Sequence, residues 1–399
     1  MKRIMLDGNG AASEAMRLSR IQVVSAYPIT PQSPISEKLS DYVADGTLKA
    51  KYIRVESEHT AMSCAIGAQL TGVRAGTATS SVGLALMHEV VNMASGVRVP
   101  IVMPVVNRSL AAPWSLWCDH QDSMAERDSG WMQFYVENSQ EVIDYILMAY
   151  HVAEHPEVLV PAMVCLDGFF LSHTSEPVFL PDQEEADAFL PPYVNNNLRL
   201  EPENPFFINN LCPTSDYSEM RYQQHMGFAK AMEVIPEVMK KFEKHFGRKH
   251  SIVEGYKLEG ADAAILALGS QAGTIRYVVD KYRDQGKKVG MVKLSTFRPF
   301  PMRELAKLLA PVPNVGVIDR SASLGACAYP VCTEVRSALA GCGAHKPVAG
   351  FIAGLAGRDI RPETVEKVFD VLLKGSYPLE PIWIDTADNA MTLREVCAC

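Results

Sequence analysis

The chain has 399 residues, of which 48% are hydrophobic and 21% are charged, the usual balance of a globular protein with a large core. Its formal net charge of -8 and its lack of concentrated Lys and Arg runs argue against a nucleic-acid-binding or basic membrane-surface protein. No apolar run reaches the roughly 18 residues of a membrane helix, and the opening MKRIMLDGNG is too short in apolar residues for a signal peptide. These features predict a cytoplasmic protein.

Nine cysteines are scattered without the CxxC spacing that zinc or iron–sulfur ligation favours. The closest pair, Cys397 and Cys399, stands at a chain end, where fraying makes a poor metal site. We therefore expect no metal in this chain and place any redox centre elsewhere.

Residues 1–175 alternate short apolar runs with segments of helical periodicity. This alternation predicts a parallel sheet with helices on both faces, the first of two α/β domains. The predicted strands are 21–27, 51–57, 75–81, 99–106, 133–137 and 161–169.

Residues 176–254 are predicted to join the two domains. Up to about residue 220 they are rich in Pro, Asn and acidic side chains and show neither period, so we expect an extended arm. A basic amphipathic helix over 231–250 and a linker follow. The order strand, Gly-Ser turn, helix, strand then starts at residue 261, so residues 255–399 are predicted to be a second parallel α/β domain.

Three prolines stiffen the segment SAYPITPQSP, residues 25–34. Proline fixes φ at about -65° and biases the preceding residue towards extended geometry, so Thr30 has little backbone freedom. Open α/β sheets bind ligands beyond the carboxyl ends of their strands, and this loop could therefore form one wall of a site. The alternative is a helix start, with Thr30 or Ser33 as the N-cap.

Two acidic residues, Glu56 and Glu58, stand between a predicted strand and a predicted helix. Both could simply complement the positive end of the helix. A carboxyl group held in an apolar cleft could instead donate a hydrogen bond to a ligand nitrogen.

The segment TATSS, residues 77–81, places hydroxyl groups at a strand end, ahead of Gly83 and another helix. Free N–H groups and hydroxyls at a helix start suit an anion or a polar ring edge. N-capping by Ser80 or Ser81 explains the same residues equally well.

A further loop begins with Arg108, directly after the predicted strand at 99–106. An arginine there suits bidentate capture of a carboxylate, whereas a surface ion pair is the simpler explanation. Asp119, His120 and Asp122 follow in the same loop. Adjacent residues rarely converge on one metal ion, so we expect them to brace the loop.

Taken together and in their order along the chain, these segments resemble the α subunit of the 2-oxoacid:ferredoxin oxidoreductases. The resemblance covers nearly the whole chain. It rests on the motifs AYPITPQSP, ESEHTAM, TSSVGLALMHE, NRSLAAPWSLWCDHQD, LDGFFLSHT, FRPFP and DRSASLG.

The resemblance implies a pyrimidine-binding fold of thiamine-diphosphate enzymes, followed by a transketolase C-terminal-like fold. It also implies oxidative decarboxylation of a 2-oxoacid on thiamine diphosphate, with coenzyme A as the acyl acceptor. The family's GDG…N segment and cluster cysteines are missing here. By resemblance, a β subunit therefore binds the diphosphate and Mg2+, and γ and ferredoxin-like δ subunits complete the enzyme, with the 4Fe-4S clusters in partner subunits. Electrons would leave to ferredoxin or to a flavin- or NAD-linked subunit.

The resemblance also assigns roles to residues of this chain. Glu58 matches the family's glutamate in SEH and would hydrogen-bond N1' of the aminopyrimidine, which activates the cofactor. Thr30 and Arg108 match the residues that hold the substrate carboxylate. The other residues expected at the cofactor are Pro28, Ile29, Ser80, Ser81 and Val82.

One departure from the family bears on the substrate. The family commonly has Gln after the two serines, where this chain has Val82. A less polar pocket, with PWSLW at 113–117 in the sequence, indicates an aromatic or branched 2-oxoacid such as phenylglyoxylate as an alternative to pyruvate. Two other functions stay open: a non-catalytic assembly subunit, and a transketolase-like transferase without redox partners.

Overall fold

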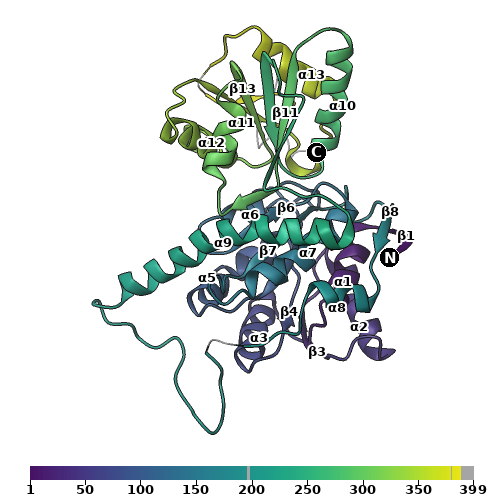
Figure 1. Ribbon diagram of the computed structural model, residues 1–399, viewed down its shortest axis with the longest axis vertical. Coiled ribbons are helices and arrows are strands. Elements are labelled where there is room, and N and C mark those ends of the chain that lie inside the picture. The colour runs from purple at the N-terminus through teal and green to yellow at the C-terminus, as the bar shows by residue number, and fades with distance from the viewer. Residues whose placement is uncertain (196–197, 379, 388–399) are drawn as a thin grey trace.

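The computed structural model describes residues 1–195, 198–378 and 380–387, which form two lobes (Figure 1). The lower lobe in the figure contains the first half of the chain, and the long helix α9 (Tyr217–Phe246) lies across it. The upper lobe contains the second half, including the described part of the carboxyl-terminal segment. Cys397 and Cys399 lie outside the described residues.

The lower lobe is built on two sheets that continue each other. Their strands are β2 (Val23–Ala26), β3 (Lys51–Arg54), β4 (Ala75–Gly76), β5 (Val102–Asn107), β6 (Met132–Tyr135), β7 (Ala162–Asp167) and β12 (Thr296–Arg298). One sheet has the order β3-β2-β4 and the other β12-β6-β7-β5, and all pairs are parallel except the edge pair β12-β6. A parallel bridge between Thr79 and Val105 joins the two sheets.

Seven helices connect and cover these strands, in agreement with the predicted alternation. They are α1 (Gly8–Leu18), α2 (Ser33–Ala44), α3 (Glu58–Leu70), α4 (Ser81–Leu86), α5 (His88–Gly96), α6 (Gln121–Ala125) and α7 (Ser139–Ala153). The central helix α7 packs against α1, α9 and β7, so nearly all of its residues are buried. Even its acid Asp144 is fully buried, where it pairs with Arg248 and His250.

The predicted arm is more regular than expected. Its first residues form β8 (Glu176–Leu180), which pairs antiparallel with β1 (Lys2–Leu6), and they continue into α8 (Gln183–Phe189). Only the stretch between α8 and α9 lacks regular structure in the described residues. The expectation of an extended arm over 176–220 was therefore wrong for its first part. The strand β8 forms because it pairs with β1, at the start of the chain, and a local sequence period cannot show so distant a partner.

The upper lobe is a second sheet in the order β15-β14-β13-β10-β11-β9, parallel except for the edge strand β9. Its strands are β9 (Val253–Tyr256), β10 (Ala263–Ala267), β11 (Val289–Leu294), β13 (Asn314–Asp319), β14 (Val348–Ile352) and β15 (Ile382–Trp383). Its helices are α10 (Gln271–Asp284), α11 (Met302–Leu309), α12 (Pro330–Gly341) and α13 (Pro362–Leu373).

The two lobes interlock at β12. This strand comes from the second half of the chain, yet its residues Thr296 and Arg298 pair with Phe134 and Gln133 of β6 in the lower lobe. The domain boundaries at residues 175 and 254 stay predictions. Among the described residues, no helix has the length and apolar character needed to cross a bilayer.

Candidate active site

The predicted site residues gather at the carboxyl ends of four neighbouring parallel strands. Thr30 follows β2, Glu58 follows β3, Ser80 and Ser81 follow β4, and Arg108 follows β5. The sheet order β3-β2-β4, continued by β5, places these loops side by side. In an open parallel sheet this edge is where ligands bind.

Glu58 is a buried acid without a partner. It occupies the first turn of α3, whose N-cap Ser57 accepts a hydrogen bond from the Thr60 N–H, and only 7% of its surface is exposed. Among the described residues its carboxyl group takes part in no hydrogen bond or ion pair. A Cβ placed on Gly83 would lie 2.6 Å from its Oε1. Glycine at position 83 therefore makes room for this carboxyl group, a role that sequence reasoning missed.

Glu56 differs from its neighbour. It is exposed, and its Oε1 accepts a hydrogen bond of 2.6 Å from the Thr60 hydroxyl. This bond lowers the pKa of Glu56. Glu56 precedes the N-cap Ser57, so the alternative drawn from the sequence, an acid in the first turn that complements the helix start, fits the position of Glu58 and not that of Glu56.

Arg108 is buried, with 3% of its surface exposed, and it meets carbonyl groups rather than acids. Its Nη1 donates to the Thr30 carbonyl at 2.8 Å and its Nε to the Ser115 carbonyl at 3.2 Å, while the Trp114 ring centre lies 5.2 Å from the guanidinium. No carboxylate of the described residues forms an ion pair with it. Burial lowers the pKa of Arg108, and the charge of Asp122 opposes this shift. Such a cation can receive an anionic ligand.

The proline-rich loop, residues 25–34, places Thr30 next to Arg108. Its carbonyl receives the Arg108 guanidinium, and its hydroxyl, on an exposed residue, has no partner in the described part of the chain. Pro31 is buried, and its carbonyl accepts a hydrogen bond of 2.9 Å from the Asn9 amide. Pro28 is exposed and Ile29 half-buried. The loop thus presents the Thr30 hydroxyl on a backbone that the hydrogen bond between Asn9 and Pro31 holds in place.

The same loop also starts a helix, as the alternative proposed. Helix α2 begins at Ser33 and has a proline in its first turn. Its N-cap is Gln32, however, and no side chain caps it, so neither Thr30 nor Ser33 serves that role.

Ser80 and Ser81 brace the adjoining loop. Their hydroxyls donate hydrogen bonds of 2.6 Å to the carbonyls of Val106 and Ser109. Ser80 stands at the N-cap position of α4, but its side chain does not cap the helix. Val82 is half-buried beside them. The two hydroxyl protons are therefore used within the protein, and they tie the loop after β4 to the loop after β5.

Asp119, His120 and Asp122 are held by separate partners. Asp119 accepts from the backbone N–H groups of Gln121 and Ala356, at 2.9 and 3.2 Å. His120 Nε2 lies 2.7 Å from Asp167 Oδ1. Asp122 accepts hydrogen bonds from the loops after β4 and β5. These bonds brace the loop, and among the described residues no three His, Cys, Asp or Glu side chains gather as metal ligands would.

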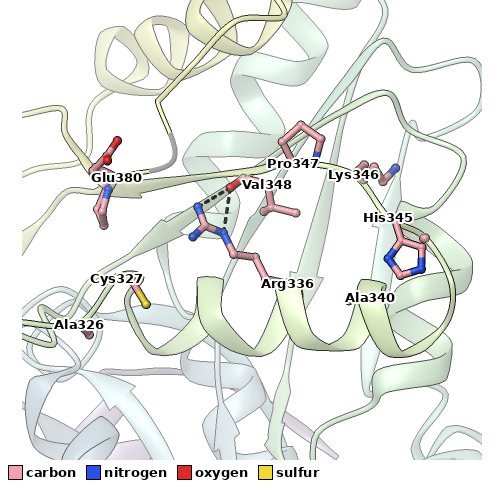
Figure 2. Close-up of a pocket in the computed structure, with 11 residues that line it drawn as sticks. Ala326, Cys327, Arg336, Ala340, His345, Lys346, Pro347, Val348 and Glu380 are labelled. Atoms are coloured by element: carbon pink, nitrogen blue, oxygen red, sulfur yellow. Dashed lines mark hydrogen bonds between the residues drawn. The ribbon is translucent and has the colours of Figure 1, made fainter.

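A cavity of about 720 Å³ lies elsewhere. It is formed by α12, β14, Glu380 and Pro381 in the upper lobe (Figure 2). Figure 2 shows the Arg336 guanidinium directed at the Val348 carbonyl, which accepts from it at 2.7 and 3.2 Å. The Lys346 ammonium donates to carbonyls of Leu309 and Ala310. The Arg336 and Lys346 side chains of this cavity therefore donate to backbone carbonyls, as Arg108 does.

The comparison with known families fits this geometry. The family described as "Pyruvate flavodoxin/ferredoxin oxidoreductase, thiamine diP-bdg" matches residues 14–240, and the "Pyruvate:ferredoxin oxidoreductase core domain II" matches residues 261–365. This chain belongs to the 2-oxoacid:ferredoxin oxidoreductase family, as its α subunit.

Similar chains span most of its length. Pyruvate synthase subunit PorA of Methanothermobacter thermautotrophicus is 46% identical over 366 residues, which cover 91% of this chain and 94% of that protein. Ketoisovalerate oxidoreductase subunit VorA of Pyrococcus abyssi is 44% identical over 371 residues, 93% of each chain. The predicted family is thus confirmed.

Solved structures confirm the predicted fold class. The 2-oxoglutarate:ferredoxin oxidoreductase of Magnetococcus marinus, solved with 2-oxoglutarate, coenzyme A and succinyl-CoA bound, superposes with a TM-score of 0.72 at 19% identity. The match covers 93% of this α subunit and 65% of that chain, so this chain spans about two thirds of it. A split-gene transketolase, described as an inactive beta4 tetramer, superposes with a TM-score of 0.54 at 12% identity, over 92% of this chain and 98% of that one.

Proposed function

We propose that this α subunit forms the pyrimidine-binding half of a thiamine-diphosphate site in a CoA-acylating 2-oxoacid:acceptor oxidoreductase. The observation that carries the proposal is that one sheet edge brings together a buried carboxyl group without a hydrogen-bond partner and a buried guanidinium without a carboxylate partner, both judged among the described residues. Unpaired buried charges are costly, and proteins retain them where a ligand completes them.

The residues present fit the aminopyrimidine of the cofactor. Glu58 would share a proton between its carboxyl group and the ring nitrogen N1', because it is buried and no protein group competes for it. Gly83 leaves space on that side. Pro28 and Ile29 on the loop after β2 would contact the ring, as would Val82 on the loop that Ser80 and Ser81 hold in place. When bound, thiamine diphosphate supplies the carbon nucleophile for the 2-oxo group.

Arg108 and Thr30 would orient the substrate carboxylate. The guanidinium is anchored by the backbone carbonyls of Ser115 and Thr30 and keeps donors for a ligand, and the Thr30 hydroxyl would contact the same carboxylate. The carboxylate has to be held in position yet leave as CO2. Contacts that orient it without overstabilising the bound substrate serve that purpose.

Pyruvate is the first substrate to test, because the relatives named pyruvate synthase are similar over most of the chain. The relative named ketoisovalerate oxidoreductase is nearly as similar, so identity alone does not choose between 2-oxoacids. An aromatic 2-oxoacid such as phenylglyoxylate is the alternative. It is favoured by the apolar Val82 and by Trp114, which is 69% exposed beside Arg108.

We further propose that the enzyme is a cytoplasmic complex. A β subunit would bind the diphosphate and Mg2+, γ and δ subunits would complete the assembly with the 4Fe-4S clusters, and ferredoxin or a flavin- or NAD-linked subunit would accept the electrons. The subunit names of the relatives support a multi-subunit enzyme.

Purification of the tagged chain from cells that express its native partners tests this function. We expect thiamine diphosphate and iron in the complex, and viologen reduction that requires both coenzyme A and a 2-oxoacid. Rates with pyruvate, 2-oxoisovalerate and phenylglyoxylate would assign the substrate, and a preference for pyruvate over phenylglyoxylate would reject the aromatic alternative. A complex with thiamine but no iron would instead favour a transketolase-like transferase, and full turnover without Glu58 would favour an assembly subunit.

A further inference from the structure

Asp122 is a buried acid that lies outside the site but accepts hydrogen bonds from the loops that form it. It sits in the short helix α6, with 1% of its surface exposed. Its Oδ2 accepts from the backbone N–H groups of Ser81 and Arg108, at 2.8 and 3.0 Å. Its Oδ1 accepts from the Asn107 side-chain amide and the Ser123 N–H, both at 2.8 Å. One carboxylate thus holds four donors.

These donors belong to the two loops that form the site. Ser81 follows β4 and stands two residues before Gly83, which contacts Glu58, whereas Arg108 follows β5. Ser81 has a φ of 51°, in the left-handed region that non-glycine residues rarely adopt without support. The bond from its N–H to Asp122 supplies that support. The same oxygen fixes the main chain of Arg108, so it sets the spacing of the two loops.

The hydrogen bond between Arg108 and Asp122 leaves the guanidinium charge of Arg108 available to a ligand. Asp122 touches the backbone N–H of Arg108 and not the guanidinium. A carboxylate placed directly on the guanidinium would form a bidentate pair and compete with any anionic ligand. A carboxylate that binds the main chain positions the arginine without occupying its guanidinium, whose Nη1 donates to the Thr30 carbonyl and whose Nη2 has no partner among the described residues.

We propose that Asp122 is a positioning residue for the substrate carboxylate, which holds the main chains of Arg108 and Ser81 at the separation that the site requires. The proposal rests on the proposed role of Arg108. It adds a residue that touches neither substrate nor cofactor.

The test uses the complete enzyme complex with the variant Asp122→Asn. The amide keeps the shape but turns one acceptor into a donor, so either the Ser81–Arg108 side or the Asn107–Ser123 side loses its bonds. We expect the KM for pyruvate and the dissociation constant of its unreactive analogue oxamate, measured by calorimetry, to rise at least about tenfold. The thiamine content should stay unchanged.

Asp119→Asn is the matched control. Asp119 lies in the same loop, is nearly as buried, and also accepts from backbone N–H groups, but these belong to Gln121 and Ala356 and not to the site loops. We expect oxamate affinity to stay at the wild-type level in this variant. Equal losses in the two variants would overturn the proposal, because general damage to the loop would then explain both.

A double variant separates this inference from the function on which it rests. If Asp122 acts through Arg108, then Asp122→Asn adds little to the loss of oxamate affinity caused by Arg108→Gln. Additive losses, or wild-type affinity in Asp122→Asn, would reject the positioning role alone. Wild-type affinity in Arg108→Gln would reject the carboxylate site itself.

A milder variant covers the case in which Asp122→Asn fails to assemble. Asn107→Ala removes one donor to Asp122 and leaves the bonds to Ser81 and Arg108 in place. We expect a smaller rise in the oxamate dissociation constant, in the same direction. An unchanged constant in a well-assembled Asn107→Ala complex would count against the proposal.

Discussion

Two arginines of this α subunit, Arg108 and Arg320, are equally buried but differ in what surrounds them. Each has 3% of its surface exposed. Arg320, after β13, forms an ion pair of 2.6 Å with Asp167 at the junction of the lobes, whereas Arg108 contacts only backbone carbonyls and an indole ring. Burial alone therefore does not mark a functional residue. What separates a binding arginine from a structural one is whether the protein itself supplies the anion.

The carboxylate of Asp167, at the junction of the lobes, is fully engaged by partners from the protein itself. Besides Arg320, its carboxylate meets His120 at 2.7 Å and the Ser270 N–H at 3.0 Å. Burial opposes the charged form, but the Arg320 and His120 charges and these hydrogen bonds hold the pKa of Asp167 well below its usual range. This group stabilises the contact between lobes and has no capacity left for a ligand.

The largest expected effect comes from Glu58, the buried acid that has no hydrogen-bond partner among the described residues. In the assembled enzyme, Glu58→Gln should lower turnover about a hundredfold or more, since an amide cannot share a proton as a carboxyl group does. Glu56→Gln is the control, because Glu56 is exposed and contacts only the Thr60 hydroxyl. Viologen reduction with each 2-oxoacid measures the effect. Similar rates in the two variants would contradict the assignment.

Arg320, whose charge is paired with Asp167, should matter for stability and not for substrate binding. Arg320→Gln leaves the buried Asp167 charge without its closest cation, and we expect a loss of about 3–5 kcal/mol. Arg108→Gln breaks no ion pair and should cost clearly less. Urea unfolding of both variants, followed by circular dichroism, measures the difference. An equal shift of the two midpoints would show that the distinction between the arginines is unfounded.

Gly83 offers a way to disturb the site without changing an ionisable group. The new methyl group in Gly83→Ala would lie 2.6 Å from Glu58 Oε1 and would displace the carboxyl group. We expect turnover to fall at least about tenfold, because small misplacements of a reacting group are costly. Gly67→Ala is the control, since its Cβ would meet no atom within 4 Å. Retention of full turnover in Gly83→Ala would mean that Glu58 need not occupy its observed position.

The smallest expected effect is a dependence on pH. Burial raises the pKa of Asp122 to about 6, against the hydrogen bonds from Asn107, Arg108 and Ser81. Protonation places a hydrogen on one of its accepting oxygens, so kcat/KM should fall as the pH drops through about 6. Asp119 also faces this carboxyl group and raises its pKa.

The sign for stability is opposite, which separates the two effects. The folded-state pKa of Asp122 lies above its unfolded value of 3.8, so the folded state binds this proton more tightly. This group therefore stabilises the fold increasingly as the pH falls from about 6 to 4, while activity declines. In Asp122→Asn the acid limb of the profile should disappear. An unchanged acid limb in that variant would assign it to another group.

The sequence predicted the sheet edge well because its signals are local. Thr30, Glu58, Ser81 and Arg108 each follow a short strand, and parallel strands bring such loops to the same edge without further information. The family motifs then supplied roles that spacing could not.

The sequence could not reveal what depends on distant contacts. β8 pairs with β1, which lies at the start of the chain, and Asp122 accepts a hydrogen bond from Ser81, 41 positions earlier. Helix α8 did carry a local signal, because Asp182 and Glu185 form a capping box ahead of it. The lack of an ion-pair partner for Glu58 and Arg108 among the described residues appears only once all neighbours are in place.

The strand β12 has a consequence for how substrate reaches this edge. Because residues 296–298 of the second half are hydrogen-bonded into the sheet of the first, swinging the lobes apart like a hinge would tear that ladder and the buried contacts around Asp167. The α subunit should therefore behave as a single rigid block during turnover. Substrate would then enter through motion of side chains at the edge of the candidate site, or through a shift of the whole α subunit against the chain that faces it.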